Sequence, residues 1–239
     1  MNLSEFNQIF KQECKKNNIK ISEDKIEEFY KYMNLILEWN EKFNLTAIKN
    51  EKEFIVKHFI DSLTIDYLVK DSKKMLDIGT GAGFPGIPLK LNNDNINVTL
   101  IDSVNKKIMV LNDVIEKIKL DNIEALHIRA EELAQNNDYR EKFDVVTTRA
   151  VSSLATIVEY MLPFVKIEGK AICMKGPNID EELENSKNAI KTLGGEIEEI
   201  KKICINEEFE RNIIIIKKIK CTNKKYPRGQ GKPVKEPIK

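Results

Sequence analysis

The sequence predicts an α/β protein in which a seven-stranded, mostly parallel sheet follows a group of N-terminal helices. Three observations support this prediction. Apolar residues before residue 70 recur at helical spacing, and after residue 72 short apolar runs alternate with helical segments. The last two apolar runs are separated by only a few residues in the sequence. Of the 239 residues, 41% are hydrophobic and 32% are charged, which is ordinary for a globular protein with a proper core.

The first 70 residues are predicted to form a helical extension. Apolar side chains recur at helical spacing from Ile26 to Phe43, and Ser22 is a plausible N-cap before them. A shorter helix is expected over residues 4–16, and a second amphipathic stretch runs from Lys52 to Leu68. We therefore divide the chain into a helical extension (1–70), an α/β core (71–220) and a basic tail (221–239).

The core alternates candidate strands with candidate helices. The strands are predicted over residues 74–79, 98–103, 125–129, 143–148, 169–175, 196–205 and 211–219. The helices are predicted over 87–91, 106–118, 130–135, 154–164 and 189–193. Such alternation indicates right-handed βαβ units and a parallel sheet with helices on both faces.

The last two predicted strands are separated only by residues 206–210. A parallel crossover needs a dozen or more residues, so these strands should form an antiparallel hairpin. A seven-stranded sheet that is parallel except for a terminal hairpin is the architecture of Rossmann-like methyltransferases, which use S-adenosylmethionine (SAM). An NAD-binding domain normally has six parallel strands, so the topology favours SAM.

A glycine-rich loop follows the first predicted strand. A lone Gly-x-Gly is weak evidence, and the segment Gly81-Ala82-Gly83-Phe84-Pro85-Gly86 matches the dinucleotide pattern Gly-x-Gly-x-x-Gly literally. Asp77 stands just before the glycines, where a carboxylate would repel a pyrophosphate but suits the ammonium group of SAM. We therefore interpret Gly79 and the residues after it as a SAM loop, with an NAD-binding module as the alternative.

The next two strand ends carry further candidate residues. Asp102 ends the second strand, where a carboxylate can accept hydrogen bonds from the hydroxyls of a ribose, although it could also be a simple turn residue. Ala130 and Glu131 follow the third strand, at the position that lies over adenine in such folds. The alternative for this pair is an ordinary helix start, where the helix dipole favours acidic residues.

The segment Thr147-Thr148-Arg149-Ala150-Val151-Ser152 follows the fourth strand and faces the methyl acceptor in such folds. It lacks the Asn/Asp-Pro-Pro-aromatic pattern of amine methyltransferases, and no cysteine nucleophile stands there, since Cys173 lies inside strand five. Methylation of N7 of guanine needs neither the amine-positioning motif nor a cysteine nucleophile, so the segment is compatible with this reaction. Arg149 could hold guanine or phosphate, position SAM or form a structural ion pair, and Lys175 supplies another cation.

Composition limits the remaining functions. Four scattered cysteines and two histidines give no zinc pattern, so we expect no metal. No apolar run approaches a membrane span and no signal peptide is evident, which predicts a cytoplasmic protein without a membrane partner. Residues 217–239 contain nine Lys or Arg and one acidic residue, Glu236, in a chain of net charge +1. This tail either binds a polyanion or is simply solvated.

These motifs together resemble the bacterial 16S rRNA guanine-N7 methyltransferases, the glucose-inhibited division protein B family. The matching segments are Trp39-Asn40, Phe43-Asn44-Leu45-Thr46, His58-Phe59-Ile60-Asp61-Ser62-Leu63, residues 76–89, Asp102-Ser103, Arg129-Ala130-Glu131, Arg149-Ala150-Val151, Lys175-Gly176 and Tyr226-Pro227-Arg228. The match is specific because these segments occur in order over nearly the whole chain. The tail departs slightly from the family pattern, with Gly229-Gln230-Gly231-Lys232-Pro233 after Arg228.

The resemblance implies methylation of a guanine N7 in the 530 loop of 16S rRNA, near the decoding region, with 16S rRNA or the small ribosomal subunit as the partner. Nothing in the sequence demands more than a monomer, so we expect one. The resemblance assigns SAM contacts to Gly79, Phe84, Ala130, Glu131 and Arg149, with Arg149 also as the candidate catalytic residue. The ribose argument adds Asp102 to this set. A SAM methyltransferase with another acceptor remains an alternative.

The resemblance also changes the weight of two other features. His58 and Asp61 lie three residues apart on one predicted helical face, so they could pair with each other or help to close the site. The basic tail becomes a candidate RNA-contacting segment, because lysine and arginine anchor phosphates without choosing a sequence.

Overall fold

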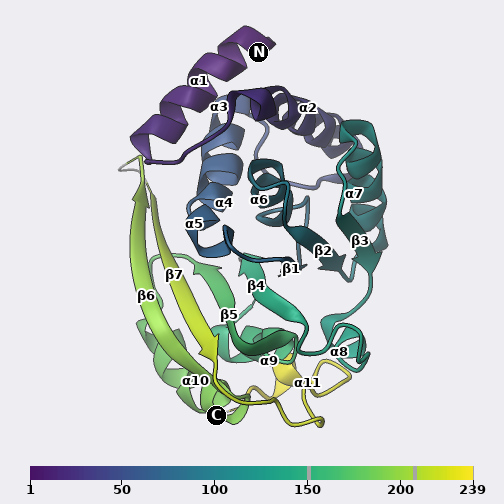
Figure 1. Cartoon of the computed structure of the whole chain (residues 1–239), viewed down its shortest axis with the longest axis vertical. Coiled ribbons are helices and arrows are strands. Elements are labelled where there is room, and N and C mark those ends of the chain that lie inside the picture. The colour runs from purple at the N-terminus through teal and green to yellow at the C-terminus, as the bar shows by residue number, and fades with distance from the viewer. Residues whose placement is uncertain (150–151, 207–208, 239) are drawn as a thin grey trace.

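The computed structural model describes residues 1–149, 152–206 and 209–238, and these form a sheet flanked by helices on both faces (Figure 1). The seven strands of this sheet lie in the order β3-β2-β1-β4-β5-β7-β6. They are β1 (Lys74–Ile78), β2 (Asn97–Asp102), β3 (Ile123–His127), β4 (Phe143–Arg149), β5 (Val165–Lys175), β6 (Gly195–Ile205) and β7 (Phe209–Lys218).

The strand pairing confirms the predicted sheet. The strands β1 to β5 pair in parallel, while β7 pairs antiparallel with both β5 and β6. The connection from Ile205 to Phe209 is far too short for a parallel crossover, so the chain can only turn back as a hairpin. The chain order reverses between β1 and β4, and this switch point is where open α/β sheets bind ligands.

The helices are α1 (Leu3–Lys16), η1 (Glu23–Lys25), α2 (Ile26–Phe43), α3 (Glu51–Phe54), η2 (Ile55–Ile60), α4 (Asp61–Leu63), α5 (Asp66–Val69), α6 (Gly86–Asn92), α7 (Asn105–Ile118), α8 (Ala130–Leu133), α9 (Leu154–Met161), α10 (Asp180–Thr192) and α11 (Lys232–Lys235). None of them, in the described part of the chain, is both long and apolar enough to span a bilayer.

The core has two halves, one on each face of the sheet. Successive β1 residues point to opposite faces, so Met75 packs with the N-terminal helices, α6 and α7, whereas Leu76 packs with α9 and α10. Both faces are therefore buried, which explains why the central strands appear in the sequence as continuous apolar runs.

Aromatic residues attach the N-terminal helices to the glycine-rich loop. The rings of Phe10, Phe29 and Phe59 lie with centroids 4.8–5.9 Å apart between α1, α2 and η2. The Tyr32 hydroxyl donates to the Ala82 carbonyl at 2.6 Å, which joins α2 directly to the loop after β1. The helical extension is thus packed against the element that the sequence assigns to the cofactor.

The amphipathic stretch predicted from Lys52 to Leu68 is helical, but it is not one regular α-helix. The structure has the short helices α3, α4 and α5 there, with a π-helical segment, η2, between α3 and α4. The hydroxyls of Ser62 and Thr64 donate to the carbonyls of His58 and Asp61, each at 2.6 Å. Such local side-chain bonds compete with regular α-helical bonds and permit the irregular turns.

Other boundaries also moved from their predicted positions. The third strand is Ile123–His127 rather than 125–129, because its pairing with β2 fixes the register from Val98 to Asp102. The helix predicted over 189–193 is α10, which begins at Asp180, and a further short helix, α11, follows in the tail. In α10, Ser186, Ala189 and Ile190 form a narrow buried stripe in a mostly charged segment. A short apolar stripe of this kind gives a weak periodic signal in the sequence.

Candidate functional site

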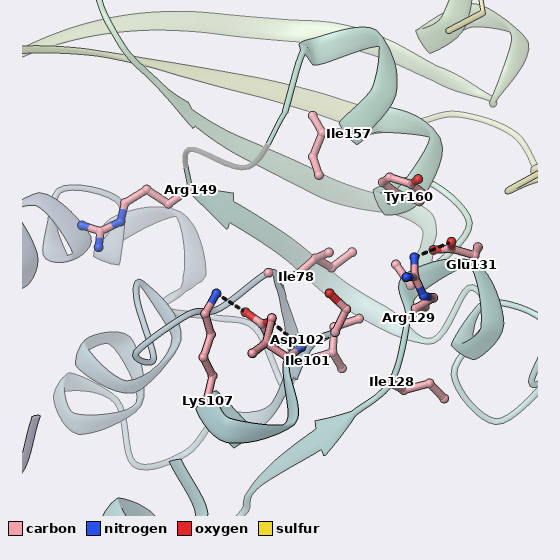
Figure 2. A pocket seen from close by; sticks show the side chains of 14 residues that line it. Ile78, Ile101, Asp102, Lys107, Ile128, Arg129, Glu131, Arg149, Ile157 and Tyr160 are labelled. Carbon is pink, nitrogen blue, oxygen red and sulfur yellow. Dashed lines mark hydrogen bonds and ion pairs between the residues drawn. The ribbon is translucent and has the colours of Figure 1, made fainter. Parts of the chain in front are cut away.

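A cavity of about 400 Å³ opens at the carboxyl ends of β1, β2 and β4, beside β3 and α8 (Figure 2). We call it the switch-point cavity. Its lining is formed by Ile78, Gly79, Ile101, Asp102, Ser103, Val104, Lys107, Ile128, Arg129, Ala130, Glu131, Arg149, Ile157 and Tyr160. The structure therefore brings together five of the residues predicted from the sequence, which lie at the ends of four different strands. They are Gly79, Asp102, Ala130, Glu131 and Arg149.

The loop after β1 is fixed to the end of β2. The N–H groups of Gly79 and Thr80 donate to the Ile101 carbonyl at 2.9 and 3.2 Å, and the Gly81 N–H donates to Asp102 Oδ2 at 3.1 Å. Gly79 and Gly81 have φ values of 68° and 62°, in the left-handed region that favours glycine. This conformation keeps the backbone close to the cavity with no side chain in the way.

Asp77 lies under the loop and is fully buried. Its Oδ2 accepts from Thr80 Oγ1 at 2.7 Å and from the Gly86 N–H at 3.1 Å, while Oδ1 accepts from Thr147 Oγ1 at 3.2 Å. Burial raises the pKa of this carboxyl to about 6. These contacts make Asp77 a support for the loop, and its expected interaction with a cofactor ammonium, directly or through water, stays a prediction.

Asp102 is buried at the end of β2, and part of its hydrogen-bonding capacity is already used. Oδ2 accepts from Gly81 and from Lys107 Nζ at 3.2 Å, and Oδ1 accepts from the Val104 N–H at 2.9 Å. A carboxylate has about four acceptor positions, so one remains on Oδ1. A ribose hydroxyl could use it, and a second hydroxyl would require the Lys107 side chain to turn away.

Ala130 and Glu131 form the first turn of α8 at the other side of the cavity. First-turn N–H groups have no acceptor within their own helix, so this end of α8 offers donors to a ligand. The Glu131 carboxylate is 9% exposed and lies 3.6 Å from Arg129 Nη1. The geometry therefore fits both interpretations, a base contact and a helix start, and the base contact stays a prediction.

Phe84 does not line the switch-point cavity. Its ring is buried and stacks on the His58 imidazole, with centroids 4.3 Å apart and an angle of 6° between the planes. The Arg149 guanidinium lies 5.1 Å from the centre of the same ring. A cofactor contact for Phe84 stays a prediction, while its observed role is to form a wall beneath Arg149.

The Arg149 guanidinium points away from the other lining residues, toward the N-terminal helices (Figure 2). Its Nη1 donates to the Lys57 carbonyl at 3.0 Å and to Asp61 Oδ2 at 2.9 Å. Its Nη2 lies 3.1 Å from His58 Nδ1. The structure thus shows the ion pair that the sequence left open as one role of Arg149, and a catalytic role stays a prediction.

His58 and Asp61 both hold Arg149. Burial is the main cause that lowers the pKa of His58 to about 3, so the imidazole is neutral. Nδ1 therefore accepts from Arg149, and Nε2 donates to Thr46 Oγ1 at 2.8 Å. The Asp61 carboxylate is fully buried and also accepts from Arg211 Nε at 2.9 Å.

The sequence did not indicate Arg211, because a charged residue in an edge hairpin is usually solvated. Its Nε and Nη2 contact both oxygens of Asp61, which lies 150 residues earlier in the chain.

The sequence analysis also did not select two polar residues of the cavity, Lys107 and Tyr160. A usable signal existed for Lys107, which stands in the first turn of the helix after Asp102.

Lys175 is not free to meet a substrate in this structure. Its ammonium donates to the Ser152 carbonyl at 2.6 Å and pairs with Glu182 Oε2 at 2.8 Å. Ala150 and Val151, which belong to the predicted segment after β4, lie outside the described residues. Lys175 therefore links Ser152, which follows β4, to Glu182 of α10.

Comparison with known proteins identifies the family. A model of the family described as rRNA small subunit methyltransferase G (GidB) matches residues 25–214. This chain belongs to that family. It is 48% identical to Ribosomal RNA small subunit methyltransferase G of Alkaliphilus oremlandii (strain OhILAs), over 98% of this chain and 100% of the relative. The protein of the same name from Clostridium botulinum (strain Loch Maree / Type A3) is 47% identical with the same coverage.

Solved structures support the fold class. TYW2 of M. jannaschii, in complex with AdoMet, gives a TM-score of 0.54 at 15% identity, over 67% of this chain and 75% of that one. TrmK of M. capricolum, in complex with S-adenosyl-homocysteine, gives 0.52 at 19% identity, over 74% of each chain. At these identities the likeness concerns the fold, and it confirms the predicted Rossmann-like methyltransferase architecture.

The family match ends before the tail, and the described part of the tail is docked on the core. Arg228 donates to the fully buried Glu159 of α9 from its backbone N–H, Nε and Nη2, at 2.8–3.3 Å. The Pro233 carbonyl accepts from Thr156 Oγ1 at 3.0 Å. Lys218 is buried among Leu162, Thr222 and Glu141, and its burial lowers its pKa to about 8.

Proposed function

We propose that this chain transfers the methyl group of SAM to N7 of a guanine in the rRNA of the small ribosomal subunit. The observation that carries the proposal is the nearly full-length similarity to relatives named Ribosomal RNA small subunit methyltransferase G. A cavity at the switch point of a methyltransferase-type sheet supports it, because this is where a nucleoside cofactor binds in open α/β folds.

The residues of the switch-point cavity fit SAM. The remaining acceptor position of Asp102 suits a ribose hydroxyl, and the first turn of α8 offers donors for the edge of the adenine. Ile78, Ile101 and Ile128 supply apolar walls for a flat base. When bound, SAM supplies an electrophilic methyl group on a sulfonium, and the chain must position the acceptor in line with it.

The choice of guanine N7 agrees with the chemistry of the lining. N7 has a lone pair in the ring plane and no proton to remove, so its methylation needs no general base or covalent nucleophile. The described lining residues include no cysteine that could act as a covalent nucleophile. Arg149, held at the end of β4, is the candidate residue for positioning the acceptor or the cofactor.

The target guanine is proposed to lie in the conserved loop of 16S rRNA near the decoding region, and the enzyme to act as a cytoplasmic monomer. The rRNA of a strain without this gene should lack one N7-methylguanosine, which nuclease digestion and mass spectrometry would detect. Restoring the gene should restore the modification. An unchanged rRNA modification map would refute the proposal.

The cofactor can be tested separately with purified protein. SAM at a hundred times its Kd should raise the free energy of unfolding by about 2.7 kcal/mol, because it binds only the folded state. NAD should give no stabilisation at the same concentration. Stabilisation by NAD alone would favour the NAD-binding alternative instead.

A further inference from the structure

A second and larger cavity, of about 1130 Å³, lies on another side of the molecule. Its walls are the segment after α1, the region of α5, the end of α6 and the edge strand β6, and Figure 1 shows α5 and the hairpin on the same side. The lining consists of residues 16–22, Leu63, Thr64, Asp66, Tyr67, Lys70, Asp71, Asn92, Asn93, Asn95 and 201–204. It shares no residue with the switch-point cavity, and we call it the lysine groove.

The lysine groove carries more positive than negative charge. It has five lysines (Lys16, Lys20, Lys70, Lys201 and Lys202) and two acidic residues. Lys16 pairs with Glu13 and Lys202 with Glu210, outside the groove lining. Among the described residues, Lys20, Lys70 and Lys201 have no carboxylate within 4.0 Å, and all three are exposed. Their charges are available to an anion.

The other polar residues of the groove suit a sugar-phosphate chain. Five asparagines line it: Asn17, Asn18, Asn92, Asn93 and Asn95. Tyr67 is 49% exposed, and Lys201 Nζ lies 4.5 Å from the centre of its ring. Lysine, asparagine and tyrosine are side chains that contact phosphates and sugars, and an exposed ring can stack on an unpaired base.

The groove adjoins another cavity, of about 890 Å³, that extends toward the end of β4. This cavity shares Lys16, Asn17 and Cys204 with the groove and is also lined by Lys52 and Lys57. Lys16 and Lys57 pair there with Glu13 and Glu53, whereas Lys52 has no carboxylate partner among the described residues. The carbonyl of Lys57 accepts from Arg149 Nη1, so this cavity begins beside the end of β4. The adjoining cavity therefore links the lysine groove to the segment that holds Arg149.

The described tail offers fewer free charges than its sequence suggested. Lys217 pairs with Glu168, Lys218 is buried beside Glu141, and Arg228 is bound to Glu159. Lys217 and Lys218 belong to β7, and the contacts of Lys218 with Thr222 and of Arg228 with Glu159 hold the tail on the core. Among the described residues, Lys224, Lys225, Lys232 and Lys235 of the tail have no carboxylate partner, so the tail also keeps free charges. The free cations of the groove come from the segments after α1 and α5 and from β6.

We propose that the lysine groove binds the sugar-phosphate backbone of the small-subunit rRNA, away from the target guanine. The inference rests on the proposed rRNA substrate and adds a second contact surface to it. Contacts of this kind position an RNA without reading its sequence, so the groove contributes affinity and orientation, while the switch-point region contributes base choice.

Lysine substitutions provide the first test. The triple variant Lys20→Ala, Lys70→Ala, Lys201→Ala should bind small ribosomal subunits at least tenfold more weakly, with SAM affinity unchanged. The slope of log affinity against log salt concentration should fall by about 2 to 3, because each lost phosphate contact removes about 0.7–0.9. The matched control, Lys224→Ala, Lys232→Ala, Lys235→Ala in the tail, should change the slope less. A smaller effect in the groove variant than in the tail variant would overturn the proposal.

Two exposed cysteines provide a second test. Cys204 lines the groove and Cys221 begins the tail, while Cys14 and Cys173 are buried and should not react. A photo-crosslinker would be attached to Cys204 in the Cys221→Ser variant, and to Cys221 in the Cys204→Ser variant. We expect the probe on Cys204 to give ribonuclease-sensitive crosslinks to small ribosomal subunits, in higher yield than the probe on Cys221.

Crosslinks from Cys204 that go only to a ribosomal protein, or a higher rRNA yield from Cys221, would overturn the groove assignment. Methylation of the same subunits by the unmodified protein is measured in parallel. Loss of the groove result with methylation intact refutes the groove alone, whereas absence of methylation refutes the proposed function.

Discussion

At the residue scale, one buried carboxylate connects three distant parts of the chain. Asp61 of α4 binds Arg149 of β4 and Arg211 of β7, and it has no exposure to solvent. Arg149 and Arg211 are 13% and 25% exposed at their side chains. Two arginines around one carboxylate leave an excess positive charge beside the switch-point cavity.

Replacing Asp61 should therefore cost more stability than replacing either arginine. Asp61→Asn leaves two partly buried guanidinium groups without their carboxylate, which should lower the free energy of unfolding by about 2–3 kcal/mol. Arg149→Ala should cost less, because Asp61 keeps Arg211, yet it should lower methyl transfer about tenfold or more. Urea unfolding and methylation rates of both variants measure the two effects. Normal turnover of Arg149→Ala would assign this residue to the ion pair alone.

The buried imidazole of His58 should make stability depend on pH. Its pKa is about 3 in the folded protein and near 6.5 in the unfolded chain, so the unfolded state binds more protons between these values. Stability should consequently fall as pH decreases from about 6.5 toward 3. The loss should be smaller in His58→Asn, because that variant has no imidazole to protonate on unfolding.

Equilibrium unfolding of both proteins across this pH range would measure the difference. Asp77, with a folded pKa of about 6, acts in the opposite direction but is present in both proteins and cancels in the comparison. Identical pH profiles for the two proteins would show that His58 is not buried in its neutral form.

At the element scale, the loop between β1 and α6 depends on close packing. A Cβ atom added at Gly86 would lie 2.3 Å from Leu100 Cδ2 and 3.0 Å from Asp77 Oδ2. Leu100 and Asp77 are fully buried, so neither can move away easily. A glycine is therefore required there by the approach of the loop to β2.

The variant Gly86→Ala should lose about 1–3 kcal/mol of stability through overpacking, and its SAM affinity should fall because the loop shifts. Gly176→Ala is the matched control, since a Cβ at that position meets nothing within 4 Å. Denaturant midpoints and calorimetric SAM titration of the two variants would measure these effects. Equal stabilities would mean that the loop tolerates a side chain at position 86.

At the scale of the whole molecule, the tail is part of the folded core. Arg228 binds Glu159, which stands between the cavity residues Ile157 and Tyr160 on α9. A cavity of about 610 Å³ lies between the tail turn and α8, with Arg129 and Glu131 common to it and to the switch-point cavity. Removing the whole tail would therefore disturb the cofactor region as well as any RNA contact.

Arg228→Ala should lower the free energy of unfolding by about 3 kcal/mol, because it leaves the buried carboxylate of Glu159 uncompensated. The tail should also become a fast site of tryptic cleavage after Lys224 or Lys225. Lys235→Ala, which removes an exposed charge from the same tail, should change neither property. Protease resistance equal to that of the unsubstituted protein would show that other contacts suffice to dock the tail.

Local sequence patterns are sufficient to predict the sheet and the residues gathered at its edge. Periodicity and the short connection before Phe209 predict the parallel strands and the hairpin, since both follow from local geometry. Gly79, Asp102 and Ala130 could be selected because each follows a strand, and the carboxyl ends of parallel strands meet at one edge.

The contacts that these side chains make depend on the folded structure. Arg149 turns to Asp61 and His58, Asp77 lies beneath the loop rather than in the cavity, and Arg228 is bound to Glu159. Each of these partners is distant in the sequence or depends on the packing of an irregular segment such as η2. Charge counts record how many cations a segment has, whereas burial and pairing decide which of them remain available for RNA.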